Sequence, residues 1–202
     1  MTEQLSLTTQ KPQRPAGRHP DDFYATPGWC VRALLDAYTP GHPADGIFEP
    51  AAGDGAILDV VAAVLPEYPR AGFEMNMERS AEARRRGHDV TCRDFLRWAP
   101  TIPQRAWVLG NPPFRLAQEF VEHALASFAP GSEVTYLLRL GFLASKRRAH
   151  LFAPGAGFAH LHVLPRRPSF TPDGGTDQYD YGWFTWRQGW TGNGTVSHLP
   201  VP

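Results

Sequence analysis

Several features that would assign a broad class at once are scarce or missing in this 202-residue sequence. Its two cysteines, Cys30 and Cys92, are too few for a disulfide framework or a zinc site, so we expect reduced thiols and no bound metal. No apolar run reaches the roughly 18 residues that span a bilayer. The polar N-terminus also lacks the apolar core of a secretory signal. These absences predict a cytoplasmic protein that does not contact a membrane.

Charge is balanced over the whole chain but not along it. The formal net charge is zero, which argues against a protein that coats nucleic acid by charge alone. No acidic residue occurs between Glu133 and Asp173, a stretch that holds three histidines. A local surface for a polyanion would explain this segment, and a solvated basic surface explains it equally well. Its other basic residues are Arg139, Lys146, Arg147, Arg148, Arg166 and Arg167.

The two ends of the chain differ in composition from its middle. Residues 1–20 are polar and rich in Pro, Gln and Thr, which predicts a disordered lead-in. Residues 189–202 are rich in Gly, Pro, Thr and Ser, which predicts a flexible tail. We therefore expect one folded domain over residues 21–188, which is enough chain for a single α/β core.

Within that domain, strand-like and helix-like segments alternate. Thr26 and Pro27 are typical of an N-cap followed by a first-turn proline, which predicts a helix directly after them. The alternation predicts an α/β fold with a mainly parallel sheet and helices on both faces. Strands are expected at 46–50, 70–75, 89–92, 106–110, 133–140, 160–164 and 181–186, and further helices at 56–65, 78–86, 116–128 and 145–152.

A possible nucleoside site follows from the ends of the first three strands. Gly53 and Gly55 stand in a loop between a strand and a helix, where glycines allow a tight turn and a close ligand, although a turn without a ligand explains them equally well. Position 58 is Leu, so the G-x-G-x-x-G dinucleotide pattern is absent. Glu74 ends the next strand, where an acid can accept from ribose hydroxyls. Asp94 and Phe95 can accept from an adenine amino group and cover its ring.

The sharpest motif is Asn111-Pro112-Pro113-Phe114, directly after an apolar strand. An exocyclic amine on an aromatic ring is a poor nucleophile because its lone pair is delocalised. The side-chain oxygen of Asn111 and the backbone carbonyl of Pro112 can accept from its two N–H bonds and favour a pyramidal nitrogen. The two prolines hold these acceptors in place, and Phe114 can stack on a flipped base. The motif therefore predicts methylation of an amino group.

The order of these motifs resembles the DNA amino-methyltransferases of the adenine-N6 and cytosine-N4 group, most closely the small phage or prophage adenine enzymes. Phe23-Tyr24-Ala25-Thr26-Pro27 precedes the Glu49–Gly55 loop, and Asp180-Tyr181-Gly182-Trp183-Phe184 resembles the phage-type subgroup. The resemblance implies a Rossmann-like class I methyltransferase with a seven-stranded sheet, one strand of which is antiparallel. It also implies S-adenosyl-L-methionine as the cofactor and DNA as the partner, in a bacterial or phage-infected cell.

Carried over residue by residue, the resemblance implies three groups of site residues. The catalytic group is Asn111, Pro112, Pro113 and Phe114. The cofactor-binding group is Tyr24, Thr26, Pro27, Glu49, Ala51, Gly53, Gly55, Glu74, Asp94 and Phe95. Only residues 144–180 are available as a short DNA-contacting segment, and the DNA-binding group is Lys146, Arg147, Arg148, Arg166, Arg167 and, on the other face of the flipped base, Phe170.

The leading hypothesis is therefore methylation of adenine N6 in DNA by base flipping and direct transfer. The same chemistry on cytosine N4, on RNA or on a protein glutamine amide is one alternative, because each presents a conjugated NH₂. A non-catalytic DNA-binding or regulatory protein with the same fold is another, and a dinucleotide oxidoreductase is a weaker third. The sequence does not distinguish a restriction–modification enzyme from a solitary or a phage self-protection enzyme, and it does not indicate the oligomeric state.

Overall fold

The computed structural model describes residues 23–40, 46–98, 104–170 and 175–200. The lead-in expected over residues 1–20 lies outside them. The helices are α1 (Gly28–Ala37), α2 (Ala56–Val64), α3 (Met77–Arg85) and α4 (Ala117–Ser127), with four short 3-10 turns, η1 (Phe95–Arg97), η2 (Phe114–Leu116), η3 (Leu140–Phe142) and η4 (Lys146–Phe152). The strands are β1 (Ile47–Glu49), β2 (Arg70–Glu74), β3 (Val90–Cys92), β4 (Trp107–Gly110), β5 (Glu133–Arg139), β6 (Phe158–Val163), β7 (Tyr181–Arg187) and β8 (Thr195–His198).

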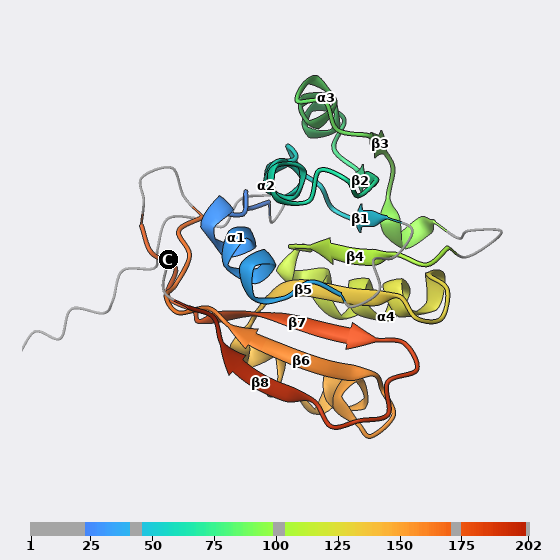
Figure 1. Cartoon of the computed structure of the whole chain (residues 1–202), viewed down its shortest axis with the longest axis vertical. Coiled ribbons are helices and arrows are strands. Elements are labelled where there is room, and N and C mark those ends of the chain that lie inside the picture. Colours follow the sequence, from blue (N-terminus) through green and yellow to red (C-terminus); the bar gives the residue numbers. More distant parts are fainter. Residues whose placement is uncertain (1–22, 41–45, 99–103, 171–174, 201–202) are drawn as a thin grey trace, which may run out of the picture.

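These strands form one twisted sheet in the order β3-β2-β1-β4-β5-β7-β6-β8 (Figure 1). Strand β7 pairs antiparallel with both β5 and β6, while the other strand pairings among the described residues are parallel. The expected mainly parallel sheet with one antiparallel strand is confirmed. The chain order reverses between β1 and β4, which is the point where open α/β sheets bind ligands at their carboxyl ends.

The sheet has one more strand than expected. Strand β8 lies in the segment for which a flexible tail was predicted, and it pairs in parallel with β6. All four of its residues are exposed, so the segment has no hydrophobic alternation that would predict a strand. Its order comes from distant partners: Thr195 and Ser197 bond the rings of His160 and His162, and Leu199, just beyond, is buried.

Two hydrophobic clusters cover the two faces of the sheet. One joins α1 and α2 to inward residues of β1, β4, β5 and β7, including Leu137 and Trp183. The other joins α4 and the η4 turn to the opposite side of the same central strands, including Tyr136 and Trp186. This division follows the alternation of side chains along a strand, and it confirms helices on both faces. The rigid sheet thereby fixes the loops at its carboxyl edge.

The start of α1 differs from its predicted form. The helix begins at Gly28, Pro27 takes the cap position, and no side chain caps the first turn. Thr26 lies one residue further out, and its hydroxyl bonds a residue on another loop. The helix is held instead by the Pro27 carbonyl, which accepts from Cys30 N at 2.9 Å, and by burial of its apolar side.

Candidate functional site

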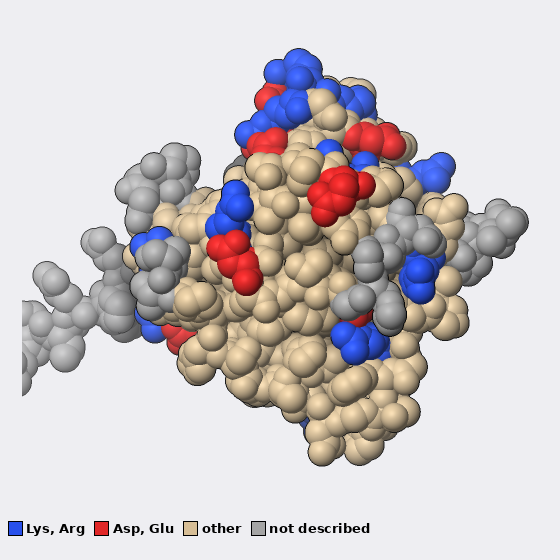
Figure 2. All heavy atoms as spheres, viewed as in Figure 1, with Lys and Arg blue, Asp and Glu red and all other residues tan. Residues whose placement is uncertain are grey.

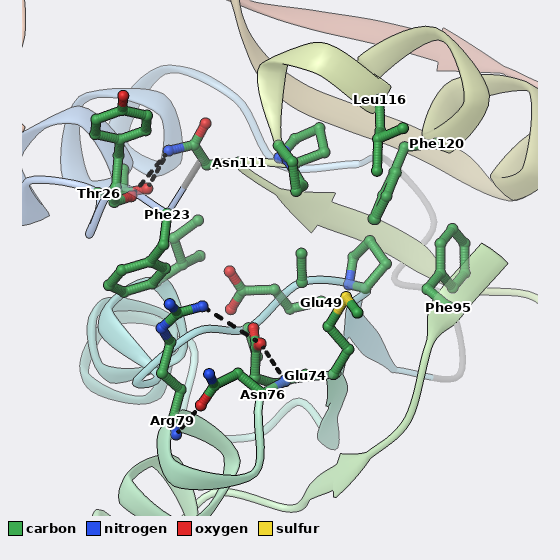
Figure 3. A pocket seen from close by; sticks show the side chains of 18 of the residues that line it. Phe23, Thr26, Glu49, Glu74, Asn76, Arg79, Phe95, Asn111, Leu116 and Phe120 are labelled. Atoms are coloured by element: carbon green, nitrogen blue, oxygen red, sulfur yellow. Dashed lines mark hydrogen bonds and ion pairs between the residues drawn. The ribbon is translucent and has the colours of Figure 1, made fainter. Parts of the chain in front are cut away.

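A cleft of about 510 Å³ opens at the carboxyl ends of β1, β2 and β4. Its volume lies in the range of small-molecule and cofactor sites. Five segments that are distant in sequence form its walls, and Figure 3 shows their side chains converging. Most of the sequence-predicted residues line it together: Tyr24, Thr26, Glu49, Ala51, Glu74, Asp94, Phe95, Asn111, Pro112, Pro113 and Phe114.

The β1–α2 loop is shaped by its two glycines. Gly53 and Gly55 have φ values of 56° and 92°, in the left-handed region that favours glycine. A Cβ at Gly53 would collide with the Phe23 ring, and one at Gly55 would stand 2.6 Å from His88 Cδ2. Gly53 N also donates to Glu74 Oε2 at 2.9 Å, which ties the loop to β2. Close packing therefore accounts for both glycines, neither of which lines the cleft.

Two buried glutamates point into the same part of the cleft, from the ends of neighbouring strands (Figure 3). Glu74 is well satisfied: its Oε1 accepts from Asn76 N at 2.8 Å, its Oε2 accepts from Gly53 N, and Arg79 lies 3.9 Å away. Glu49 is 2% exposed, and its Oε2 has no hydrogen-bond partner among the described residues. Burial, followed by the nearby Glu74 carboxylate, raises the pKa of Glu49 well above its usual range.

Asp94 and Phe95 take structural positions on the far wall of the cleft. Asp94 caps η1, because its Oδ1 accepts from Leu96 N at 3.0 Å. Phe95 is 2% exposed and packs against Phe120 and the ring of His123. Its ring is thus part of the core, whereas the sequence motif suggested a ring free to cover a base. Both residues still line the cleft, so their expected contact with an adenine stays a prediction.

Several cleft residues are not among the site residues predicted from the sequence. Phe23 packs on Gly53 and lies under the Arg79 guanidinium, whose Cζ is 4.2 Å from the ring centroid. Met75 directly follows Glu74 and is 71% exposed although it is apolar. The position of Met75, an apolar residue next to a strand-end acid, could have marked it as a cleft residue from the sequence alone. The place of Arg79, on α3, follows only from the fold.

The Asn111 loop leaves β4 and turns at once into η2. Asn111 Nδ2 donates to Thr26 Oγ1 at 3.0 Å and to the Tyr24 carbonyl at 3.3 Å. Asn111 Oδ1 is buried and has no partner among the described residues. A buried acceptor without a partner is costly, and it can be satisfied by a ligand that donates. Asn111, which lines the cleft, therefore keeps one hydrogen-bond acceptor that no described residue uses.

An aromatic group surrounds Phe114. Tyr24 stacks on it with the ring centroids 5.8 Å apart, and Phe170 and Tyr181 pack at 6.1 Å and 5.6 Å. The Arg139 guanidinium lies over the same ring, with its Cζ 4.7 Å from the centroid. The structure thus brings Phe170 into contact with Phe114, and its expected place over a flipped base stays a prediction. The contacts hold the Phe114 ring in one position beside the cleft.

The predicted DNA-binding cations differ in how firmly the protein holds them. Arg148 Nε donates to the Phe142 carbonyl at 2.8 Å, and Arg166 lies over the Trp29 ring. Arg147 and Arg167 form exposed ion pairs with Glu119 and Asp180. None of these basic residues lines the cleft. On the face drawn in Figure 2, Lys and Arg side chains gather at the top over α3, and others are scattered across the rest of the face.

Two features are absent from the described residues. No helix in this part of the chain is both long and apolar enough to cross a membrane. Within the same residues, no three His, Cys, Asp or Glu side chains come together in a way that could hold a metal ion.

Comparison with known proteins identifies the fold. No family model matches the chain, and no curated protein matches it in sequence. A putative class I S-adenosylmethionine-dependent methyltransferase from Listeria monocytogenes is 15% identical, with a TM-score of 0.67 over 91% of this chain and 68% of that one. A predicted O-methyltransferase from Agrobacterium tumefaciens is 22% identical, with a TM-score of 0.62 over 84% and 86%.

A third solved structure is a type I restriction-modification methyltransferase subunit from Streptococcus thermophilus. It is 15% identical, with a TM-score of 0.64 over 83% of this chain and 45% of that one. At these identities the likeness shows the fold alone. The chain has the Rossmann-like fold of class I methyltransferases, with β8 added at the edge of the sheet.

Proposed function

We propose that this protein transfers a methyl group from S-adenosyl-L-methionine to the exocyclic amino group of a nucleic-acid base, with adenine N6 in DNA as the acceptor. The observation that carries the proposal is Asn111 Oδ1, a buried acceptor without a partner in the wall of a cleft that is large enough for a cofactor. If the protein were a dinucleotide oxidoreductase, Asn111 Oδ1 would have no role in the reaction. An amine that donates to it would satisfy it.

The residues of the cleft fit the cofactor. A ribose would donate its hydroxyls to Glu74, whose carboxylate is already fixed by two backbone N–H groups. The unpaired Glu49 carboxyl suits the cationic amino-acid end, because a nearby positive charge favours the ionised form of a buried acid. Met75 and Leu96 provide apolar surface for the adenine. When bound, the cofactor supplies an electrophilic methyl group on a sulfonium.

The protein's own contribution is to hold the amine in position. Asn111 Oδ1 and the Pro112 carbonyl accept from its two N–H bonds, which turns the nitrogen lone pair toward the methyl group. Orientation of two reactants can supply roughly 7–11 kcal/mol of such a barrier. The nitrogen loses one proton after it bonds to the methyl group and has become acidic, so no strong base is required. Phe114, fixed by its aromatic neighbours, offers a ring on which a flipped base can stack.

The basic residues near the carboxyl edge support a nucleic acid as the partner. Among the described residues, Arg147 and Arg167 form exposed ion pairs, which contribute little and exchange readily for phosphate. If the methyl acceptor were a glutamine amide in a protein, these cations would have no phosphate groups to bind. Type I restriction-modification subunits and RNA methyltransferases both occur among the proteins of similar fold, so either DNA or RNA is compatible with the fold.

The test is methyl transfer from labelled S-adenosylmethionine to unmethylated duplex DNA, followed by digestion and mass spectrometry of the nucleosides. We expect label in N6-methyldeoxyadenosine with the wild type and none with Asn111→Ala. Glu82→Gln, on the outer side of α3, is the matched control and should keep wild-type activity. Label in cytosine would correct the base, and label in RNA alone would correct the polymer. Cofactor binding without transfer to either polymer would contradict the proposal.

A further inference from the structure

The side-chain amide of Asn111 has two ends, and only one of them can activate an amine. If the oxygen faces the cleft, it accepts from the substrate N–H groups. If the nitrogen faces the cleft, two donors meet and the substrate is repelled. The two orientations have the same shape, so packing alone does not choose between them. The chain must fix the orientation through hydrogen bonds.

The segment that precedes α1 makes that choice. The Tyr24 carbonyl can only accept, so the amide end facing it must be the donor, Nδ2, at 3.3 Å. The Thr26 hydroxyl oxygen accepts from the same nitrogen at the shorter distance of 3.0 Å (Figure 3). A reversed amide would set Oδ1 against the Tyr24 carbonyl and lose that bond. Both donor hydrogens of Asn111 are therefore used on the N-terminal segment, and the oxygen is left unpaired.

The position of Thr26 is fixed by its surroundings. It is 6% exposed, and because it precedes Pro27 its backbone is restricted to extended conformations. The helix that follows is anchored to the sheet, since Trp183 Nε1 donates to the Cys30 carbonyl at 3.0 Å. The neighbouring Tyr24 ring packs on Phe114, so the segment contacts the catalytic loop twice. The hydroxyl thus has a defined place relative to β4.

We propose that Thr26 is a positioning residue: its hydroxyl holds the Asn111 amide in the orientation that the Tyr24 carbonyl selects, with Oδ1 toward the acceptor amine. This inference rests on the proposed function, because it assigns Asn111 Oδ1 as the atom that receives the substrate. It changes the role of Thr26 from the expected cofactor contact to a residue that acts through Asn111. The hydrogen-bond partner of Thr26 is the side chain of Asn111, 85 positions away in sequence, rather than the cofactor.

The kinetic test compares Thr26→Val, which keeps the shape but removes the acceptor, with Thr26→Ser, which keeps the hydroxyl. Loss of one neutral hydrogen bond should lower kcat about three- to tenfold in Thr26→Val, with kcat of Thr26→Ser within about twofold of the wild type. The Kd for S-adenosylmethionine, measured by calorimetry, and the thermal midpoint should stay near the wild-type values in both. A weaker Kd with unchanged kcat would make Thr26 a cofactor contact and overturn the proposal.

A second readout does not depend on activity. In the ¹⁵N-labelled full chain, the side-chain NH₂ signals of Asn111 are identified by their loss in Asn111→Ala. We expect slow solvent exchange of these hydrogens in the wild type and in Thr26→Ser, and faster exchange in Thr26→Val. Equal exchange in all three would overturn the proposal. If the wild type methylates no nucleic acid, the proposed function fails, while this exchange measurement still decides whether Thr26 fixes the amide.

Discussion

Two buried glutamates at opposite edges of the sheet have very different surroundings. Glu49 ends β1 at the carboxyl edge and is 2% exposed; Glu133 begins β5 at the other edge and is 6% exposed. Glu133 accepts from Arg187 Nε at 2.7 Å and from the Tyr38 hydroxyl. Glu49 Oε2 has no partner among the described residues. A buried acid that is paired serves the fold, whereas one left unpaired is a cost that a ligand can offset.

The same contrast extends to the uncharged groups around each acid. Near Glu133, Trp107 Nε1 donates to Thr135 Oγ1, which also bonds the Thr185 hydroxyl. Near Glu49, Asn111 Oδ1 is an acceptor without a partner among the described residues. The contrast has exceptions, because His162 Nε2, Gln188 Oε1 and Trp190 Nε1 on the Glu133 side are also buried without a partner among these residues. None of these three residues lines the cleft, so the combination of an unpaired atom with a cleft is what marks the site.

The largest effect expected from this comparison is on stability. Glu133→Gln should lower the free energy of unfolding by about 2 kcal/mol, since it removes the charge that two donors satisfy. The effect is kept moderate because Arg187 is 32% exposed. The matched change, Glu49→Gln, should leave the stability equal or higher at neutral pH. Chemical denaturation of both variants measures the difference. Equal losses would mean that Glu49 has a partner in solution.

The sign of the Glu49 effect follows from its pKa. Burial raises the pKa of Glu49 in the folded protein above its unfolded value. As pH rises, Glu49 therefore loses its proton at a lower pH in the unfolded chain than in the folded protein. The free energy of unfolding falls as pH rises from the unfolded pKa through the folded pKa. The stability of Glu49→Gln relative to the wild type should accordingly grow with pH. Denaturation at several pH values tests this trend.

The second prediction concerns cofactor affinity. A cationic ligand favours the ionised form of Glu49, so the affinity of the wild type for S-adenosylmethionine should rise with pH as this raised pKa is crossed. Binding at lower pH should release a proton, which calorimetry in buffers of different ionisation enthalpy detects. Glu49→Gln should weaken binding at least about tenfold, as expected for a lost hydrogen bond to a charged group, and should remove the pH dependence. A pH dependence that survives in Glu49→Gln would assign it to another group.

Local sequence patterns predicted the parts of this fold that depend on neighbours in the chain. The strand–helix alternation gave the parallel sheet, and the Asn111–Phe114 motif lies where a strand-end loop should be. What failed depends on distant partners. Strand β8 is ordered by pairing with β6. Thr26 reads locally as a helix cap, yet its hydroxyl bonds Asn111. Such pairings leave no periodic signal in the sequence.

The smallest effects are expected within the basic triplet Lys146, Arg147 and Arg148. This triplet allows a second comparison between a firmly bonded group and an exposed one. Arg147 is 72% exposed and pairs only with Glu119, whereas Arg148 Nε is bonded to the Phe142 carbonyl and its guanidinium packs over the Phe142 ring. Arg147→Ala should keep the stability within about 0.5 kcal/mol and reduce the salt slope of DNA binding by about 0.9, as for one phosphate contact. Arg148→Ala should do the reverse, with a loss of about 1 kcal/mol in stability and an unchanged slope.

Lys146→Ala completes this series, because Lys146 forms no hydrogen bond or ion pair with a described residue and its side chain is exposed. It should match Arg147→Ala in both measurements if the outward part of the triplet faces phosphate. Binding of duplex DNA titrated over a range of salt gives the slope, and denaturation gives the stability. Equal slope losses for Arg147→Ala and Arg148→Ala would mean that Arg148 leaves its carbonyl in the complex. In that case an arginine that is hydrogen-bonded in the free protein can still bind phosphate in the complex. The distinction between paired groups that serve the fold and unpaired groups that serve a ligand, drawn from Glu49 and Glu133, would then hold only for buried groups.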